Sequence, residues 1–258
     1  MNALIGDIGN TDTKICLIDI KSFTFNKVIH FKSYNILSKN FLKNNIHKIL
    51  KKKDIHKFAL FSSVVPKYLS EVKKILRTSY RVKLIEIKDK KINKIIKANI
   101  KNKKQVGSDR IANAVGVYKK YKSDCIVLDF GTATTFDVVT KKGVYNGGII
   151  APGINLSINS LSNAADQIPI FSIKKQKKII GKDTLEALRS GFYWGYIGLI
   201  NNIILKIEQE TKKKYKIIFT GGHANLFKSS ILREYIIDKN ITLSGIVEIF
   251  KNNKKYLI

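Results

Sequence analysis

Residues 125–140, CIVLDFGTATTFDVVT, contain the pattern that decides the fold. An apolar run ends in Asp-Phe-Gly, a turn rich in Thr follows, and a second apolar run returns. This order predicts a β-hairpin with its polar side chains at the turn. The N-terminal residues repeat it: NALIGDIG (2–9) ends in Asp-Ile-Gly, Asn10-Thr11 follows, and KICLIDI (14–20) returns. The two copies lie about half a chain apart, so we expect an internal duplication into two similar domains.

The residue types at the two turns suit phosphate groups. Gly lets the backbone approach a phosphate closely, and successive N–H groups of a turn form an anion site. Asp7 and Asp129 place a carboxylate where Mg²⁺ or a monovalent cation can bridge the phosphates. A single Asp-x-Gly is more often an ordinary hairpin turn. Two copies, together with Thr220-Gly221-Gly222 after a later apolar run, favour a nucleotide site.

Apolar runs with strand and helix spacing alternate along the chain, which predicts an α/β fold with mixed sheets. Further strands are expected at 57–66, 82–87 and 216–222, and helices at about 108–118, 154–164, 184–211 and in the closing segment. We expect the two domains to span residues 1–117 and 118–258.

Charge is the unusual feature of the composition. The chain has 258 residues and a formal net charge of +29, from 48 Lys and Arg against 19 Asp and Glu. Such an excess favours binding to nucleic acid through counterion release. However, only five basic residues are Arg, and the Lys residues are dispersed along the chain. Nucleic-acid surfaces usually add Arg forks and aromatic platforms. Because Lys, Ile and Asn all have AT-rich codons and are abundant together, we attribute the charge to compositional bias.

The remaining composition indicates a cytoplasmic protein without a membrane segment. Cys16 and Cys125 lie in apolar runs, which is typical of buried thiols in a reducing compartment. The N-terminus has no basic region followed by an apolar stretch, so no secretory signal is expected. The apolar tract 191–207 is interrupted by Gly and Asn, which favours a buried or interface helix over a membrane span. The four His residues lack metal-ligand spacing, so no zinc site is expected.

Six motifs follow one another in a definite order. They are DIGNTDTK (7–14), GSDR (107–110), DFGTATT (129–135), GGIIAPG (147–153), GKDT (181–184) and FTGGHA (219–224). The two hairpins and the Gly-Gly turn resemble the acetate-kinase, sugar-kinase, heat-shock and actin ATPase superfamily. The full order is similar to that of type III pantothenate kinases. The resemblance implies two duplicated RNase H-like (actin-like ATPase) domains, with mixed sheets and an active-site cleft between them that holds ATP and pantothenate.

The resemblance also implies an activity. It is the transfer of the ATP γ-phosphoryl group to pantothenate, which gives 4'-phosphopantothenate in the first step of coenzyme A biosynthesis. Asp109 takes the family's proton-acceptor position, and an in-line transfer needs such a carboxylate beside the substrate hydroxyl. By its spacing alone, Asp109 could equally be an acid that stabilises a helix start. Arg110 suits the substrate carboxylate or the phosphate, and Gly107 and Ser108 complete the substrate-binding turn.

ATP-binding positions, by the same resemblance, are Asp7, Gly9, Asn10, Thr11, Lys14 and Thr132. Asp129 resembles the family's ligand for a monovalent cation, K⁺ or NH₄⁺, and Asp7 is a candidate for the Mg²⁺ side. Lys14 has the alternative of a strand residue that faces solvent. Thr184 resembles a substrate contact supplied across a homodimer interface, and its alternative is a helix N-cap.

The chain departs from the family in one place. Many members carry an aromatic residue and Asn-Pro shortly before Gly-x-Asp-Arg, where this chain has Ile100 and Asn102-Lys103. We expect altered substrate binding with the chemistry retained. Two other readings stay open: a nucleic-acid-binding or regulatory protein on the same fold, and another small-molecule kinase of the superfamily. No helix-turn-helix, zinc-finger or aromatic RNA-binding pattern supports the first of these.

Overall fold

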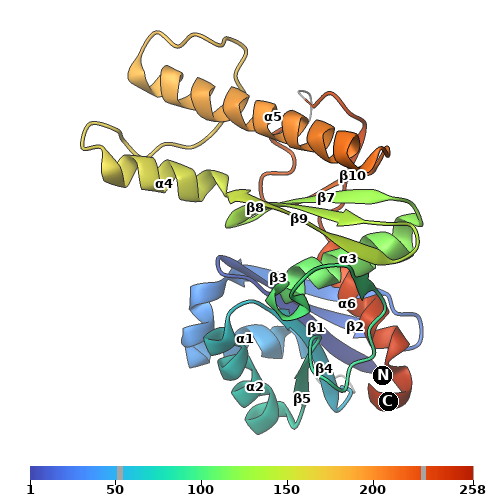
Figure 1. Cartoon of the computed structure of the whole chain (residues 1–258). Coiled ribbons are helices and arrows are strands. Elements are labelled where there is room, and N and C mark those ends of the chain that lie inside the picture. The colour runs from blue at the N-terminus through green and yellow to red at the C-terminus, as the bar shows by residue number, and fades with distance from the viewer. Residues whose placement is uncertain (51–54, 228–230, 258) are drawn as a thin grey trace. The chain divides into compact units, whose positions relative to one another are not determined.

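The computed structural model describes residues 1–50, 55–227 and 231–257. The chain forms two compact units, each described by itself (Figure 1). The first comprises Met1–Lys122, Lys142–Tyr145 and Asn240–Ile258, and the second comprises Ser123–Lys141 and Asn146–Lys239. The sequence-based expectation is a boundary at 117/118, and the first unit runs to Lys122 before the chain leaves it. The division differs at the C-terminus, because the closing segment packs with the first unit and not with the second.

The first unit contains a mixed five-stranded sheet in the order β3-β2-β1-β4-β5. Its strands are β1 (Asn2–Ile8), β2 (Asp12–Asp19), β3 (Phe25–Lys32), β4 (Phe58–Ser63) and β5 (Lys83–Glu86). β1, β2 and β3 are antiparallel neighbours, whereas β4 and β5 join as parallel strands. The predicted hairpin at the N-terminus is therefore confirmed, within an α/β unit.

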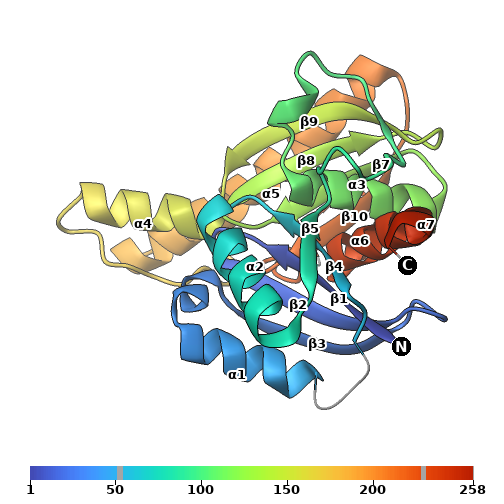
Figure 2. The same cartoon turned by 90° about the horizontal axis from the view of Figure 1, so that it is seen from below.

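Each face of this sheet has its own core. Successive side chains of a strand point to opposite faces. Leu4 and Ile8 of β1 pack with α1 (Lys39–Leu50) and α2 (Pro66–Tyr80). Ala3 and Ile5 pack with α3 (Ser108–Tyr121) and α6 (Ile241–Asn252) on the other face. Figures 1 and 2 show these helices on both sides of the sheet. Short helices complete the unit: η1 (Ser33–Leu37), η2 (Lys103–Gln105) and α7 (Lys254–Leu257).

Two glycines explain why the C-terminal helix returns to the first unit. A Cβ on Gly245 of α6 would overlap the backbone oxygen of Ala112 in α3. A Cβ on Gly116 of α3 would lie 2.5 Å from the backbone oxygen of Ile241. The absence of both side chains lets the helix backbones touch, and buried Thr242 Oγ1 donates a hydrogen bond to Asn113 Oδ1 at 2.7 Å.

The second sheet has six strands in the order β11-β10-β7-β8-β9-β6. They are β6 (Lys97–Ala98), β7 (Cys125–Phe130), β8 (Ala133–Val139), β9 (Val144–Pro152), β10 (Lys216–Gly221) and β11 (Tyr235–Ile237). β7 and β8 form the second predicted hairpin, and β10 runs parallel to β7 and β11. Ile126, Leu128 and Phe130 of β7 belong to a core shared with α4 (Ile154–Ala164) and α5 (Thr184–Thr211).

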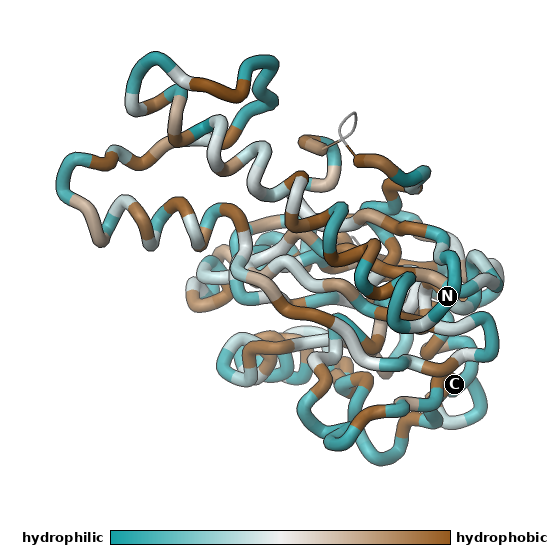
Figure 3. Tube along the Cα trace, turned by 45° about the horizontal axis from the view of Figure 1, so that its top comes forward, coloured by the Kyte–Doolittle hydropathy of each residue, from teal (hydrophilic) through white to brown (hydrophobic). Residues whose placement is uncertain are grey.

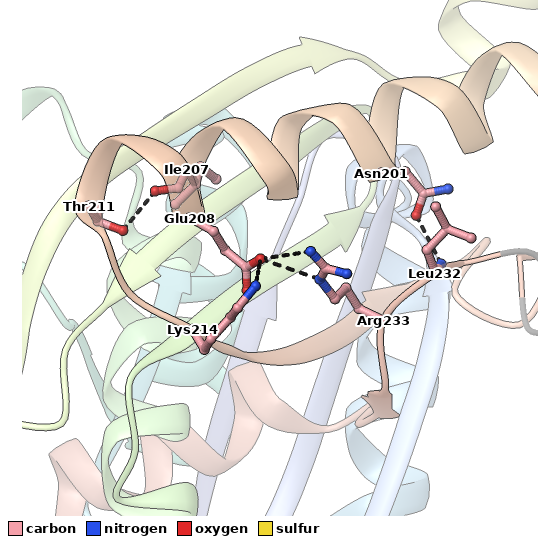
Figure 4. A network of polar contacts seen from close by, with 7 residues as sticks. All are labelled: Asn201, Ile207, Glu208, Thr211, Lys214, Leu232 and Arg233. Atoms are coloured by element: carbon pink, nitrogen blue, oxygen red, sulfur yellow. Dashed lines mark hydrogen bonds and ion pairs between the residues drawn. The ribbon is translucent and has the colours of Figure 1, made fainter.

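A buried glutamate links the C-terminal end of α5 to two basic residues that follow the helix in the chain. The Glu208 side chain is 5% exposed, and its Oε2 accepts hydrogen bonds from Lys214 Nζ and Arg233 Nη2, each at 3.0 Å (Figure 4). Burial alone would raise the pKa of Glu208, but the hydrogen bonds and charges of Lys214 and Arg233 outweigh it and lower that pKa. Arg233 thereby ties the segment before β11 to the helix.

Hydrophilic and hydrophobic residues alternate along the described chain (Figure 3). In Figure 3, teal residues recur throughout the described chain and are not gathered in one segment. Across the described ranges, no helix is both long enough and apolar enough to pass through a membrane.

Candidate active site

The first hairpin places the predicted nucleotide residues of the first unit around one turn. Gly9 N donates to Asp12 O at 3.0 Å and closes the turn, while Asn10 and Thr11 are exposed at its tip. Asp7 stands opposite Lys14 in the β1–β2 register, and both side chains are half-buried. The polar groups of this turn therefore face the same edge of the sheet.

The end of β4 adds two serines that sequence analysis missed. β4 runs parallel to β1, and Ser62 pairs with Asp7 in the register. The Ser62 side chain is fully buried, and its Oγ has no hydrogen-bond partner in the described structure. Carboxyl ends of parallel strands meet at one sheet edge. The polar residues near the end of the predicted strand 57–66 could therefore have indicated that these serines lie close to the first hairpin.

Ser108 connects that strand to the start of α3. Its Oγ donates to Ser63 O at 2.6 Å and accepts from Ser63 N at 3.0 Å. This reciprocal pair fixes the first residue of the helix to the end of β4. The Gly107–Arg110 turn and the first hairpin are thus joined through β4, so the structure brings together the substrate and nucleotide positions predicted in this unit.

Asp109 carries a carboxylate with a raised pKa. Burial is the main cause, and a hydrogen bond from Arg110 N, together with the charges of Arg110 and Lys88, opposes the rise only in part. Its Oδ1 accepts that bond at 2.8 Å. A carboxylate of raised pKa is a stronger proton acceptor than an ordinary Asp, and such shifts gather at catalytic sites. Gly107 makes room for it, because a Cβ there would overlap Asp109 Oδ1.

Arg110 is supported by an aromatic ring. Its guanidinium carbon lies 5.9 Å from the ring centroid of Tyr145, which is 2% exposed. The negative face of the ring attracts the cation. Tyr145 comes from the start of β9, far along the chain, and no sequence pattern linked it to Arg110.

Two glycine motifs meet at the second hairpin. Gly153 N, just before α4, donates to Thr132 O at 3.1 Å, and a Cβ on Gly153 would overlap that oxygen. Gly221 has a φ of +86°, and a Cβ there would lie 2.7 Å from Asp129 Oδ1. Gly222 N donates to the neighbouring Phe130 O at 3.0 Å. Asp129 and Thr132 therefore stand among backbone segments that only glycine can occupy so closely.

Comparison with known proteins decides the family. The family model for type III pantothenate kinase matches residues 3–206. The chain belongs to the type III pantothenate kinase family. It is therefore a phosphotransferase. A type III pantothenate kinase from Pelagibacter ubique (strain HTCC1062) is 46% identical over 247 residues, which cover 95% of this chain and 96% of that relative.

Solved structures show the fold of this kinase. One is a conserved protein from Campylobacter jejuni, described as a proposed Baf family transcriptional activator, with a TM-score of 0.62 and 21% identity. It covers 98% of the kinase chain and 99% of its own. An archaeal actin homolog matches with a TM-score of 0.54 and 13% identity over 97% of the kinase chain and 99% of its own. These likenesses confirm the predicted actin-like ATPase fold.

Thr184 of the kinase stands at the start of α5. The helix is capped by Asp183, whose side chain accepts from Glu186 N at 2.7 Å, and Glu186 Oε2 accepts in turn from Lys182 N at 2.9 Å. The arrangement is similar to a capping box, with the second hydrogen bond moved from the N-cap residue to the residue before it. The alternative role of N-cap thus belongs to Asp183, and Thr184 is an exposed first residue whose side chain is available to another molecule.

The donor set suits a nucleotide-bound cation. Among residues 1–50, 55–227 and 231–257, no group of three His, Cys, Asp or Glu gathers to hold a metal ion. Mg²⁺ on a nucleotide takes most of its ligands from phosphates and water and needs only one or two carboxylates. Each unit has one half-buried carboxylate at its hairpin, Asp7 in the first and Asp129 in the second, and either one alone meets that requirement.

Proposed function

We propose that this kinase transfers the γ-phosphoryl group of ATP to the primary hydroxyl of pantothenate and forms 4'-phosphopantothenate. The observation that carries the proposal is the half-buried Asp109 carboxylate of raised pKa at the start of α3, in the Gly107–Arg110 turn. The names of the matching family and of the Pelagibacter relative support pantothenate as the acceptor and coenzyme A biosynthesis as the pathway.

Asp109 is the proton acceptor in this proposal. The pantothenate hydroxyl oxygen forms a bond to the γ-phosphorus, the bond from that phosphorus to the ADP oxygen breaks, and the hydroxyl proton moves to Asp109. Asp109 must be ionised to accept it, so its raised pKa sets the lower pH limit of the reaction. Arg110, held over Tyr145, supplies a fixed positive charge for the substrate carboxylate or the transferred group.

The two hairpins bind ATP. Exposed turn N–H groups near Asn10, Thr11 and Thr132 suit phosphate oxygens, and Lys14 adds a positive charge beside the first turn. Asp129 is the ligand of a monovalent cation, and Asp7 lies on the Mg²⁺ side. When bound, these cations neutralise negative charge on the phosphates.

The kinase acts as a homodimer through α5. Gly191, Gly195 and Gly198 lie on its exposed face, and a Cβ on any of them would have no atom within 4 Å in the described structure. Beside the helix, Ile179 and Ile180 are 69% and 72% exposed. Exposed apolar groups next to a glycine face favour close packing with a second copy. Gly195→Arg should give a monomer in sedimentation velocity, and a wild-type monomer at micromolar concentration would contradict the proposal.

One assay tests the function. Purified protein with ATP, Mg²⁺ and pantothenate should release ADP in a coupled assay, at a rate that falls when K⁺ and NH₄⁺ are omitted. Asp109→Asn should reduce kcat by a factor of 10² or more, roughly the contribution of a general base, and leave ATP binding intact. Asp166→Asn, at an exposed acid of the second unit, is the matched control. Full activity of the Asp109 variant would refute the role of that residue.

A further inference from the structure

A lysine side chain holds the segment that leads into the Asp109 turn. Lys88 follows β5, and its Nζ donates to Lys104 O and to Val106 O, each at 2.9 Å. Both acceptors are backbone carbonyls of the short stretch before Gly107. At the other end of that stretch, Asn102 Oδ1 accepts from Lys104 N at 3.1 Å. Lys88 therefore holds the C-terminal part of this loop, and Asn102 makes a local turn at its start.

The backbone of Lys88 is itself anchored. Lys88 N donates to Glu86 Oε2 at 2.7 Å, and Ile87 N donates to Phe61 O of β4 at 2.9 Å. Burial raises the pKa of Glu86, while the hydrogen bond from Lys88 N and the charge of Lys88 oppose the rise. An ammonium group donates up to three hydrogen bonds and accepts none, so it suits the pairing of two carbonyls. Lys88 thus connects the end of β5 to the loop before α3 by hydrogen bonds.

We propose that Lys88 is a positioning residue for Asp109, because it holds the backbone that precedes the catalytic turn and places a positive charge near the carboxylate. This inference rests on the proposed function. Two anchors then define the turn: Ser108 binds Ser63 at the end of β4, and Lys88 binds Val106 beyond the end of β5. A misplacement of a reacting group by about 1 Å can cost two orders of magnitude in rate, so the loop matters although it lies outside the turn.

The charges around Asp109 come from two elements. Arg110 belongs to α3 itself, and Lys88 follows the end of β5. Arg110 and Lys88 both lower the pKa of Asp109 against the effect of burial. Loss of the Lys88 charge therefore raises the pKa of Asp109 further. The acidic limb of the kcat/KM profile should move to higher pH, because a larger fraction of the base is protonated at any given pH.

The experiment compares Lys88→Met with Lys88→Arg. Lys88→Met should lower kcat by roughly tenfold or more, shift the acidic limb to higher pH and leave the KM for ATP unchanged. Lys88→Arg keeps a charged donor and should restore much of kcat and the wild-type pH limb. Lys90→Met, at an exposed neighbour, is the control. Thermal unfolding of each variant verifies that it is folded.

Two results would overturn the proposal. One is an unchanged kcat and pH limb in Lys88→Met. The other is a loss of kcat with an unmoved limb and no recovery in Lys88→Arg, which would indicate a purely structural role. Asp109→Asn separates the two levels of inference: if it is inactive while Lys88→Met behaves as wild type, the proposed function stands and only the role of Lys88 fails.

Discussion

Gly107 controls the position of the carboxylate two residues further on. Its backbone φ of −57° is open to any residue, so no backbone strain demands glycine here. Glycine is required at position 107 for a steric reason, because a Cβ there would overlap Asp109 Oδ1. Glycine at position 107 therefore leaves the space that the Asp109 carboxylate occupies.

Gly107→Ala should damage catalysis more than folding. The added methyl displaces the Asp109 carboxylate, and we expect kcat to fall by one to two orders of magnitude, roughly the penalty of a misplaced catalytic group. The midpoint of thermal unfolding and the KM for ATP should change little, since the backbone conformation suits Ala. Steady-state kinetics beside calorimetry checks this. A wild-type kcat would show that the carboxylate has another position open to it.

Asp109 should lower the stability of the fold near neutral pH. Its pKa is higher in the folded protein than in the unfolded chain. The folded state therefore binds the proton more tightly, and the free energy of unfolding falls as the pH rises through the interval between those two pKa values. Asn at this position carries no charge and can still accept from Arg110 N.

Asp109→Asn should thus unfold at a higher temperature than the wild type at pH 8. The difference should vanish at a pH below the unfolded pKa of Asp, where both side chains are neutral. Calorimetry at several pH values measures this. A variant that is less stable than the wild type at pH 8 would contradict the burial argument.

At the scale of elements, the contact between α3 and α6 supports the catalytic turn. Asp109 lies in the first turn of α3, and the same helix is held against the sheet by α6 through Gly116 and Gly245. Ala112 and Val115 of α3 share one core with α6 and the sheet. We therefore expect a change at the C-terminal helix to affect the helix that carries Asp109, the proposed base.

Gly245→Ala should destabilise the first unit. Ala normally stabilises a helix interior relative to Gly, but here the methyl would overlap the backbone of Ala112. Overpacking of this kind costs about 1–3 kcal/mol, so the midpoint of urea unfolding should fall. Ser244→Ala, one residue earlier on α6, should stay within about 0.5 kcal/mol of the wild type. Equal stability of the two variants would show that the helices can separate without penalty.

Sequence reasoning succeeded where the signal is local. The two hairpins, α3 and α5 follow from apolar periodicity, turn residues and capping residues, and the motif order gave the family. It did not predict that the C-terminal helix packs with the first unit. The close approach of Gly245 to Ala112 produces no periodic pattern in the sequence. Tyr145 and Lys88 were missed for a related reason: they act through tertiary contacts with residues distant in the chain.

At the scale of the whole molecule, the net charge of +29 is the feature that most needs a test. We expect the kinase to retain a fluorescent duplex DNA at low salt and to lose it near physiological ionic strength, because dispersed lysines give only counterion-release binding. Fluorescence anisotropy across a KCl titration measures this. Sequence-dependent binding that persists at physiological salt would favour the regulatory reading.

The return of the chain to its first unit has a consequence for biosynthesis. After Lys122 the chain belongs to the second unit, apart from Lys142–Tyr145. It returns to the first unit at Asn240. A ribosome therefore delivers Asp109 long before α6, and the nascent sheet face around Ala3 and Ile5 stays uncovered until the last residues are translated. Arrested or truncated translation products would contain every catalytic motif and still lack a finished core. The enzyme should thus mature only at the end of synthesis, and its incomplete chains should be clients of chaperones and proteases.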